Sequence, residues 1–318
     1  MKISSNQIKK FFRVMFDKSY RIGVFANAGF YNGLSDEKFL KKVFKAYMGR
    51  DLDLDAPKTF NEKLQWLKLY NRRPEYVIMA DKFKVRDFIA EKLGEEYLIP
   101  LIGVWDDPDE INFDALPDRF VLKCNHNSGL GMCICTDKSK LDIEKTREEL
   151  RRGIKEDFFI KKREWPYKDI PRKIIAEKFM VDDETGELRD YKFFCFNGKV
   201  DSVMVCMERA TGNTKFYFFD RNWKLLRLNL RGKTAPADFT LPKPSNMDEM
   251  FDIAAKLSEG MPFSRIDLYS VNGKTYFGEI TFFPDSGFDK NLLPETDKHW
   301  GELINLPEKT TEGKNHAK

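Results

Sequence analysis

Charged side chains alternate with apolar ones along two strand-like runs in the segment FSRIDLYSVNGKTYFGEITFF, residues 263–283. By strand periodicity, one face of the first run carries Arg265, Asp267 and Tyr269, and one face of the second carries Glu279 and Thr281. A two-residue Asn272-Gly273 turn would put Asp267 and Glu279 on opposite faces, whereas a three-residue loop, residues 271–273, makes them diagonal neighbours. The second geometry predicts an oxygen site suited to Mg²⁺, which takes one or two carboxylates plus substrate phosphates. The alternative is a salt bridge within the strand pair, such as Glu279 with Arg265.

A second predicted hairpin, in the segment RDYKFFCFNGKVDSVMVCMER, also concentrates charge on one face. A two-residue turn at Asn197-Gly198 pairs Lys192 with Val203. This register places Asp190, Lys192 and Arg209 on one face, and Phe193, Cys195, Val200 and Met204 on the other. The charged face fits either an anionic ligand or a solvated surface.

Two lysines stand where backbone N–H groups can help to hold phosphate. Lys123 ends the strand-like run DRFVLK, and a polar loop with two glycines follows at residues 125–131. Lys82 lies in the first turn of a predicted helix that Asp81 opens, where an anionic ligand would be favoured. The loop is neither a P-loop nor a dinucleotide-binding fingerprint. A solvated hairpin and a solvated lysine are the alternatives.

The composition is that of a cytoplasmic globular protein. The chain has 318 residues, enough for two lobes, and a net charge of +4, so we expect no nucleic-acid partner. Five cysteines without a zinc-site pattern indicate reduced thiols in the core. We expect neither a signal peptide nor a transmembrane run.

The hydrophobic periodicity predicts a mostly helical beginning followed by alternating elements. Helices are expected over residues 35–49, 58–70 and 81–94, and later over 140–158 and 246–260. Strands are expected over residues 98–105, 119–124, 132–136, 173–181, 189–196, 199–207, 215–219, 264–270 and 275–283. Hairpins with helices between them indicate an α+β fold built on antiparallel sheets.

The segment NQIKKFFRVMF, residues 6–16, has an amphipathic helical pattern. Ile8, Phe11, Phe12, Met15 and Phe16 fall on one side, and Lys9, Lys10 and Arg13 fall on the other. Such a helix either packs on the core of the protein or makes a peripheral contact with the inner face of an anionic membrane.

The order of these features resembles the ATP-grasp superfamily, whose two α+β subdomains clamp MgATP. The segments KTFNEKLQWLKLY, DKFKVRDFIAEKLGEEYLIPLIGVW, FVLKCNHNSG, REWPYKDIPRKIIAEKFM and DYKFFCFNGK are similar to the TupA-like ATP-grasp proteins, which are linked to teichuronopeptide and other surface-polysaccharide biosynthesis. The resemblance runs from about residue 35 to 305. It implies a helical N-terminal region at 1–80, an ATP-grasp core at 81–307 with lobes 81–172 and 173–307, and a flexible tail at 308–318.

The resemblance also implies roles for individual residues. Lys82 and Lys123 would contact the ATP phosphates, and a flap with Asn125, Ser128, Gly129 and Gly131 would cover them. Glu177 and the backbone of Lys178 and Met180 would hold adenine, and Asp190 would lie near the ribose. Lys192, Arg209 and Arg265 would be catalytic, and Asp267, Glu279 and Thr281 would bind Mg²⁺. Thr281 departs from the family pattern, which has an asparagine there.

The implied reaction is ATP-dependent ligation of a carboxylate to an amine through an acyl phosphate. The acceptor would be a small-molecule or glycan carboxylate, such as a uronic acid, and residues 163–171 are a candidate acceptor loop. A phosphotransferase on the same fold and a non-catalytic scaffold are alternatives. A third is a glycosyltransferase that uses the D-x-D repeat of Asp51, Asp53 and Asp55 to bind a nucleotide-sugar metal. The oligomeric state is left open.

Overall fold

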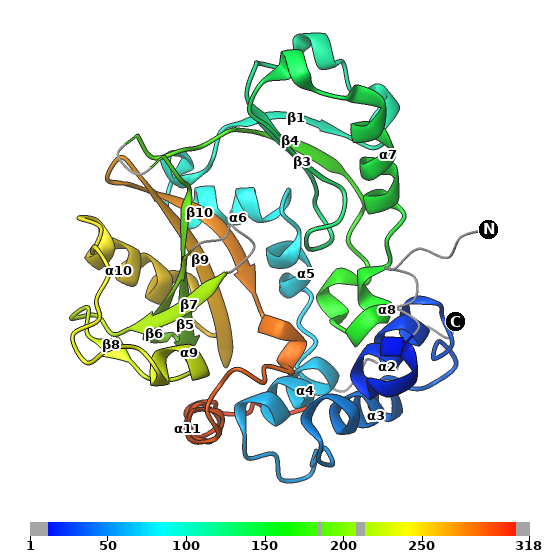
Figure 1. Ribbon diagram of the computed structural model, residues 1–318, viewed down its shortest axis with the longest axis vertical. Helices are drawn as coiled ribbons and strands as arrows, with labels where there is room; N and C mark the ends of the chain where they lie inside the picture. The colour runs from blue at the N-terminus through cyan, green and yellow to red at the C-terminus, as the bar shows by residue number, and fades with distance from the viewer. Residues whose placement is uncertain (1–11, 184–185, 208–213, 310–318) are drawn as a thin grey trace.

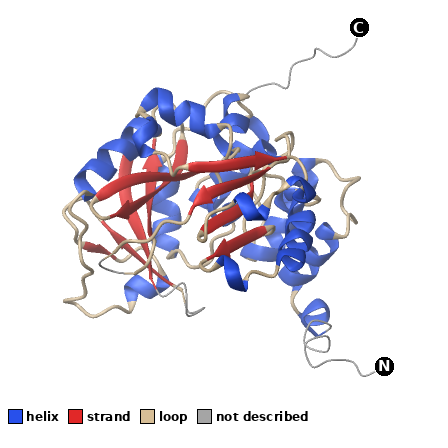
Figure 2. Cartoon of the chain, turned by 90° about the horizontal axis from the view of Figure 1, so that it is seen from above, coloured by secondary structure: helices blue, strands red, loops and turns tan. Residues whose placement is uncertain are grey.

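The computed structural model describes residues 12–183, 186–207 and 214–309, and in this part of the chain two antiparallel sheets lie beside a group of helices (Figure 1). Figure 2 shows the same arrangement from above. The α+β class and the antiparallel sheets predicted from the periodicity are confirmed. None of the helices in the described stretches is long and apolar enough to cross a membrane.

The smaller sheet has the strand order β1-β4-β2-β3. Its strands are β1 (Leu101–Trp105), β2 (Phe120–Cys124), β3 (Met132–Cys135) and β4 (Ile174–Lys178). Helix α7 (Ile143–Ile154) packs on β2 and β3 and buries Leu150 against Phe120 and Leu122. This small core is separate from the main core of the protein.

The larger sheet has the strand order β10-β9-β5-β6-β7-β8. Its strands are β5 (Arg189–Phe196), β6 (Lys199–Met207), β7 (Lys215–Phe219), β8 (Leu225–Leu226), β9 (Phe263–Val271) and β10 (Lys274–Thr281). Helix α10 (Met247–Leu257) covers one face, where the rings of Phe193 and Phe251 lie 5.1 Å apart. Helix α11 (Pro294–Leu303) covers one end of the other face, where Trp300 stacks on Phe194 at 4.7 Å. Aromatic rings therefore fill both sides of this sheet.

The remaining helices lie mostly in the first half of the chain. They are α2 (Lys18–Asn27), α3 (Asp36–Met48), α4 (Phe60–Tyr70), α5 (Glu75–Ala80), α6 (Val85–Lys92), α8 (Phe158–Lys162) and α9 (Leu230–Lys233). Local chemistry sets their ends: Ser35 caps α3, Gly49 ends it with a left-handed φ of 74°, and Thr59 with Glu62 forms a capping box on α4. Short 3₁₀ turns include η1 (Glu95–Tyr97), η5 (Trp165–Tyr167) and η7 (Pro284–Gly287).

The β9–β10 hairpin decides between the two turns considered above. Its turn has two residues, Asn272 and Gly273, with φ values of 53° and 74°, and the expectation that such a turn puts Asp267 and Glu279 on opposite faces is wrong. Asp267 lies directly opposite Glu279, because the register shifts between Phe277 and Glu279. The extra residue is Gly278, which makes a β-bulge and turns Glu279 to the face of Asp267.

The β5–β6 hairpin also departs from the predicted register. Its two-residue Asn197-Gly198 turn is confirmed, but the pairing shifts at Asp201, so that Phe194 faces Ser202 and Cys195 faces Val200. Lys192 therefore pairs with Met204 and not with Val203, and Met204 lies on the charged face, where the sequence analysis had excluded it. Both errors have one physical cause: each bulge adds a residue that the turn length does not reveal.

Candidate functional site

The paired strands β5, β9 and β10 bring six of the predicted site residues together on one sheet face. Lys192, Asp267 and Glu279 form one row across the three strands, because Lys192 pairs with Asp267 and Asp267 pairs with Glu279. Arg265 and Thr281 face each other in the next row. Lys192 Nζ donates to Asp267 Oδ2 and lies 2.7 Å from Asp190 Oδ2.

Arg265 is the centre of this cluster. Its Nε lies 2.6 Å from Asp267 Oδ1, and its Nη2 lies 2.7 Å from Asp267 Oδ2. The same Nη2 donates to Glu279 Oε1 at 3.1 Å and to Thr281 Oγ1 at 3.0 Å. The salt bridge between Glu279 and Arg265, given above as the alternative to a metal site, is therefore present in this form of the protein.

The two carboxylates of the cluster differ in accessibility. The Asp267 side chain is 2% exposed and the Glu279 side chain is 39% exposed. Burial alone would raise the pKa of Glu279, but the positive charges of Lys82, Arg265 and Lys192 lower it to about 2. Burial alone would lower the pKa of Lys192, but Asp267 and Asp190 raise it. Glu279 is thus an ionised and accessible carboxylate at neutral pH.

The cluster fits Mg²⁺ through Glu279 more directly than through Asp267. Glu279 Oε1 accepts hydrogen bonds. None of the residues that the structure describes donates a hydrogen bond to Glu279 Oε2. Both oxygens of Asp267 are taken by cationic side chains. The described residues contain no group of three acidic, histidine or cysteine side chains able to hold a metal. A single carboxylate still suffices where Mg²⁺ keeps water ligands and takes phosphate oxygens.

The smaller sheet supplies a second set of charged side chains. Lys123 Nζ lies 2.6 Å from Glu177 Oε2, and Arg86 Nη1 lies 3.6 Å from Glu177 Oε1. The backbone N–H of Lys178 donates to Pro100 O at 3.0 Å, so an adenine contact by the Lys178 backbone would have to use its carbonyl. Met180 is half-buried just beyond the end of β4.

Lys82 connects the two sets. It lies in the turn before α6, and its Nζ donates to Asn127 O at 2.5 Å. Burial lowers the pKa of Lys82, and the nearby Lys123 lowers it further, whereas Glu279 opposes the change. Lys82 is therefore close enough to Lys123 on β2 and Glu279 on β10 to interact with both charges.

The predicted flap, residues 125–131, has a buried start and an exposed tip. Asn125 is buried and donates to Asp81 Oδ1 at 2.8 Å and to Pro171 O at 2.9 Å, so its side chain holds the loop in place. Ser128 and Gly129 are exposed. Gly131 is needed for close packing, because a Cβ there would lie 2.7 Å from Gly153 Cα.

Three other predictions concern Arg209, the N-terminal segment and the D-x-D repeat. Arg209 lies outside the described residues, as do residues 6–11 of the amphipathic N-terminal segment. Asp51 lies 2.9 Å from Lys45, and Asp53 accepts from the backbone N–H groups of Asp55 and Ala56, which is the pattern of a surface turn. The D-x-D repeat therefore lies exposed between α3 and α4, and its role in the surface turn accounts for these aspartates.

Three residues near the site were missed in the sequence analysis. Gly278 makes the bulge that orients Glu279, and a glycine inside a strand is a recognised sign of one. Arg86 reaches Glu177 and lies four residues after Lys82, a spacing that puts both on one helical face. Lys68 is fully buried in α4, and the helical pattern gave no sign of it.

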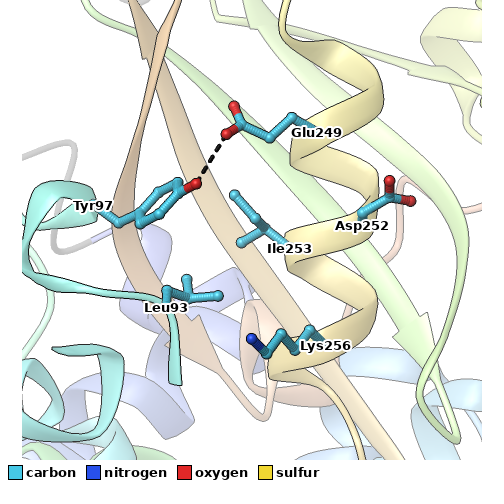
Figure 3. A pocket seen from close by; sticks show the side chains of 6 residues that line it. All are labelled: Leu93, Tyr97, Glu249, Asp252, Ile253 and Lys256. Atoms are coloured by element: carbon cyan, nitrogen blue, oxygen red, sulfur yellow. Dashed lines mark hydrogen bonds between the residues drawn. The ribbon is translucent and has the colours of Figure 1, made fainter. Parts of the chain in front are cut away.

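Two surface hollows lie apart from the charged cluster. One hollow of about 510 Å³ lies between η1 and α10, where Tyr97 Oη donates to Glu249 Oε1 at 3.0 Å (Figure 3). Leu93, Asp252, Ile253 and Lys256 complete its lining. A second hollow of about 350 Å³ lies beside α9, and neither is lined by a predicted site residue. We interpret the hollow between η1 and α10 as the junction of the segment before β1 with α10, the helix that covers one face of the larger sheet.

Comparison with known proteins shows the fold family to which the chain belongs. Two antiparallel sheets with lysines on one and an Asp-Glu-Arg cluster on the other define an ATP-grasp fold. The model of the TupA-like ATP-grasp family matches residues 62–305, and the chain belongs to this family. The cysteines are unpaired thiols, as predicted. A search of curated proteins found no match.

Solved structures show distant likenesses. The D-alanine–D-alanine ligase from Bacillus anthracis complexed with ATP is 16% identical, with a TM-score of 0.42 over 70% of this chain and 60% of that one. The D-alanine–D-alanine ligase from Helicobacter pylori is 14% identical, with a TM-score of 0.43 over 77% and 69%. The ATP-grasp ligase PsnB with ADP and Mg is 11% identical, with a TM-score of 0.38 over 70% and 57%. The chain thus spans about 60% of the length of the first of these ligases.

Proposed function

We propose that this protein is an ATP-dependent carboxylate–amine ligase that forms an amide through an acyl phosphate. The observation that supports it most is Glu279, an accessible carboxylate that accepts a hydrogen bond from Arg265 and that the charges of Lys82 and Arg265 keep ionised. A MgATP site requires cations that bind phosphate oxygens and an anion that binds the divalent cation. The family of the chain points to the same nucleotide.

Each charged group has a role in this proposal. Lys82 and Lys123 bind phosphate oxygens of ATP, and the loop tip at Ser128 and Gly129 closes over them. Glu279, with Thr281 beside it, would hold Mg²⁺, which would neutralise charge on the transferred phosphoryl group. Asp267 anchors Lys192 and Arg265, which stabilise that group during transfer. Its role as a metal ligand stays a prediction.

The chemical steps need no side-chain nucleophile. An oxygen of the acceptor carboxylate attacks the γ-phosphorus, and the bond from that phosphorus to the β–γ bridging oxygen breaks to release ADP. A neutral amine then attacks the carbonyl carbon of the acyl phosphate, phosphate leaves, and the amine proton passes to solvent. The protein contributes by holding the reacting groups in line and by neutralising charge.

The substrate class rests on the family alone. TupA-like proteins are linked to surface-polysaccharide biosynthesis, so we propose a uronic acid of a glycan as the carboxylate and an amino acid as the amine. A phosphotransferase would use the same ATP residues and differ only in its product. The glycosyltransferase reading is weaker, because the exposed D-x-D repeat already has a structural role in a surface turn.

The test compares thermal stabilisation by MgATP with stabilisation by Mg²⁺ and UDP-sugars. We expect a saturable upward shift with MgATP only, and an apparent affinity about tenfold or more weaker in Glu279→Gln, because an anionic ligand is lost. Asp53→Asn is the matched control and should keep the wild-type affinity. ADP release with hydroxylamine trapping of an acyl phosphate would then separate a ligase from a phosphotransferase. A shift with a UDP-sugar alone would contradict the proposal.

A further inference from the structure

A fully buried lysine lies outside the charged cluster, on α4. Lys68 Nζ donates to Ser286 O at 2.7 Å, to Gln65 Oε1 at 3.0 Å and to Lys162 O at 3.1 Å. Its ammonium also lies over the ring of Phe288, 4.9 Å from the ring centroid. A buried charge is stable only with such partners. Lys68 therefore holds the three acceptors and the ring in place around its Nζ.

The main partner of Lys68 is an unusual turn, η7. Asp285, Ser286 and Gly287 have φ values of 46°, 54° and 66°, so two residues with side chains adopt the left-handed conformation in succession. Non-glycine residues adopt this conformation only where neighbouring contacts hold them. Those contacts come from α4: Lys68 and Gln65 both donate to Ser286 O, and Gln65 also donates to Gly287 O at 2.7 Å.

The same turn is joined to the candidate acceptor loop. Ser286 Oγ donates at 2.5 Å to Glu164 Oε1, and Glu164 is a buried carboxylate that balances the charge of Lys68. Glu164 directly precedes η5, in which Tyr167 packs its ring 4.8 Å from that of Phe158. Burial, together with the carboxylates of Glu164 and Glu279, raises the pKa of Tyr167. Tyr167 is therefore close enough to Glu164 and to Glu279 of the charged cluster to interact with both charges.

The register of the sheet fixes where this turn lies relative to a bound nucleotide. Along β9 and β10, successive rows hold Tyr269, then Asp267 with Glu279, then Arg265 with Thr281. Rows are about 6.6 Å apart, and η7 begins three residues after Thr281. Asp190, proposed to lie near the ribose, is paired with Tyr269 at the opposite end. The turn therefore lies on the far side of the cluster from the nucleoside, where the phosphoryl group would be transferred.

We propose that Lys68 is a positioning residue of the reaction. Through the hydrogen bond from its Nζ to Ser286 O, Lys68 holds η7 and, through Glu164, the segment Trp165–Tyr167. Both are then fixed beside the transferred phosphoryl group, where the acceptor carboxylate is placed. The helical region before the two sheets thus acts in the site through α4. This inference rests on the proposed ligase function.

The test uses the full chain with Lys68→Met and, as the matched control on the same helix, Lys63→Met, whose Nζ donates to Ile304 O at 2.9 Å. We expect amide hydrogen exchange of residues 283–289 to become about tenfold or more faster in Lys68→Met and to stay unchanged in the control. With ATP, D-glucuronate and glycine as probes, the KM for the carboxylate should rise about tenfold, and the Kd for ATP should stay within about twofold. If Lys68→Met does not fold, Glu164→Gln, which keeps the shape but removes the charge, takes its place.

The outcomes separate the two proposals. A folded Lys68→Met with wild-type exchange in residues 283–289 overturns the positioning role. Faster exchange with an unchanged KM for the carboxylate overturns its connection to the acceptor. Wild-type protein that neither binds ATP nor releases ADP overturns the ligase function itself, and the role of Lys68 in that reaction falls with it.

Discussion

Arg265 connects the two interpretations of the charged cluster, which are a salt bridge and a metal site. It pairs with both carboxylates and with Thr281, which is how a cluster of buried charges stays neutral when no phosphate is bound. Glu279 keeps one oxygen without a hydrogen bond from the described residues, so it can take a cation without breaking every contact of Arg265. We infer that Glu279 can both pair with Arg265 and serve as a metal ligand, as two states of one carboxylate.

Lys68 provides a prediction for the dependence of stability on pH. Burial lowers its pKa from 10.5 to about 7, although Glu164 opposes the change. Between these values the unfolded chain binds a proton that the folded chain does not, so the free energy of unfolding rises with pH above about 7. The increase is at most about 1.4 kcal/mol per pH unit. Urea unfolding of the wild type and of Lys68→Met between about pH 7 and 9 measures it.

The variant lacks this titration, so the stability difference in favour of the wild type should widen as the pH rises. Lys63→Met serves again as the control, because Lys63 is only partly buried. Parallel profiles for the wild type and Lys68→Met would mean that Lys68 stays protonated in the folded protein throughout this range.

At the scale of elements, the bulge in β10 determines whether the site exists. A Cβ at Gly278 would lie 2.8 Å from the backbone oxygen of Asp267 and 3.0 Å from the ring of Tyr269. We therefore expect Gly278→Ala to lower the free energy of unfolding by roughly 1–3 kcal/mol and to weaken binding of MgATP, since the strands must separate at the row of Glu279. Urea unfolding and thermal stabilisation by MgATP measure the two effects.

Gly33→Ala is the control for this substitution, since nothing lies within 4 Å of a Cβ there. It should change neither quantity appreciably. Wild-type stability together with wild-type ATP affinity in Gly278→Ala would show that the bulge is not required to orient Glu279.

The two hairpins also show which features the sequence could predict. Strand positions and the Asn-Gly turns follow from local periodicity and turn chemistry. The nine predicted strands agree with observed ones to within a few residues, but the two-residue strand β8 was not predicted. The bulges at Asp201 and Gly278 shift the pairing without changing the turns, so turn chemistry could not predict them, although a glycine inside a strand was a sign of the second bulge. The predicted closeness of Asp267 and Glu279 was right, but it arises from the bulge at Gly278 and not from a three-residue loop.

The resemblance predicted the cluster residues better than their partners. Lys192, Arg265, Asp267, Glu279 and Thr281 meet on one face, as their order in the family implies. The contacts of Lys68 join α4 to segments about 94 and 218 residues away in sequence, and no short pattern reveals such pairs. Buried polar networks of this kind become visible only when the elements are packed together.

At the scale of the whole molecule, the start of the described chain exposes several large apolar side chains close together in sequence. Phe12, Met15 and Phe16 are 54%, 52% and 77% exposed in the helical stretch before α2, with the cations of Arg13 and Lys18 beside them. Helix α2 itself packs on α3 and α8. Exposed aromatic rings next to cations are typical of a helix that lies on an anionic lipid surface.

We therefore predict that the protein binds anionic vesicles through this stretch. Cosedimentation with phosphatidylcholine–phosphatidylglycerol vesicles at low salt should capture the wild type, and the double variant Phe12→Ser, Phe16→Ser should bind about tenfold more weakly. Each fully buried phenylalanine contributes roughly 1.5–3 kcal/mol, and a ring at the interface contributes part of that. Phe30→Ser, which removes an exposed ring outside the stretch, should bind like the wild type. Equal capture by neutral vesicles, or equal capture of the double variant, would contradict a membrane contact made through these residues and would favour their packing against another protein.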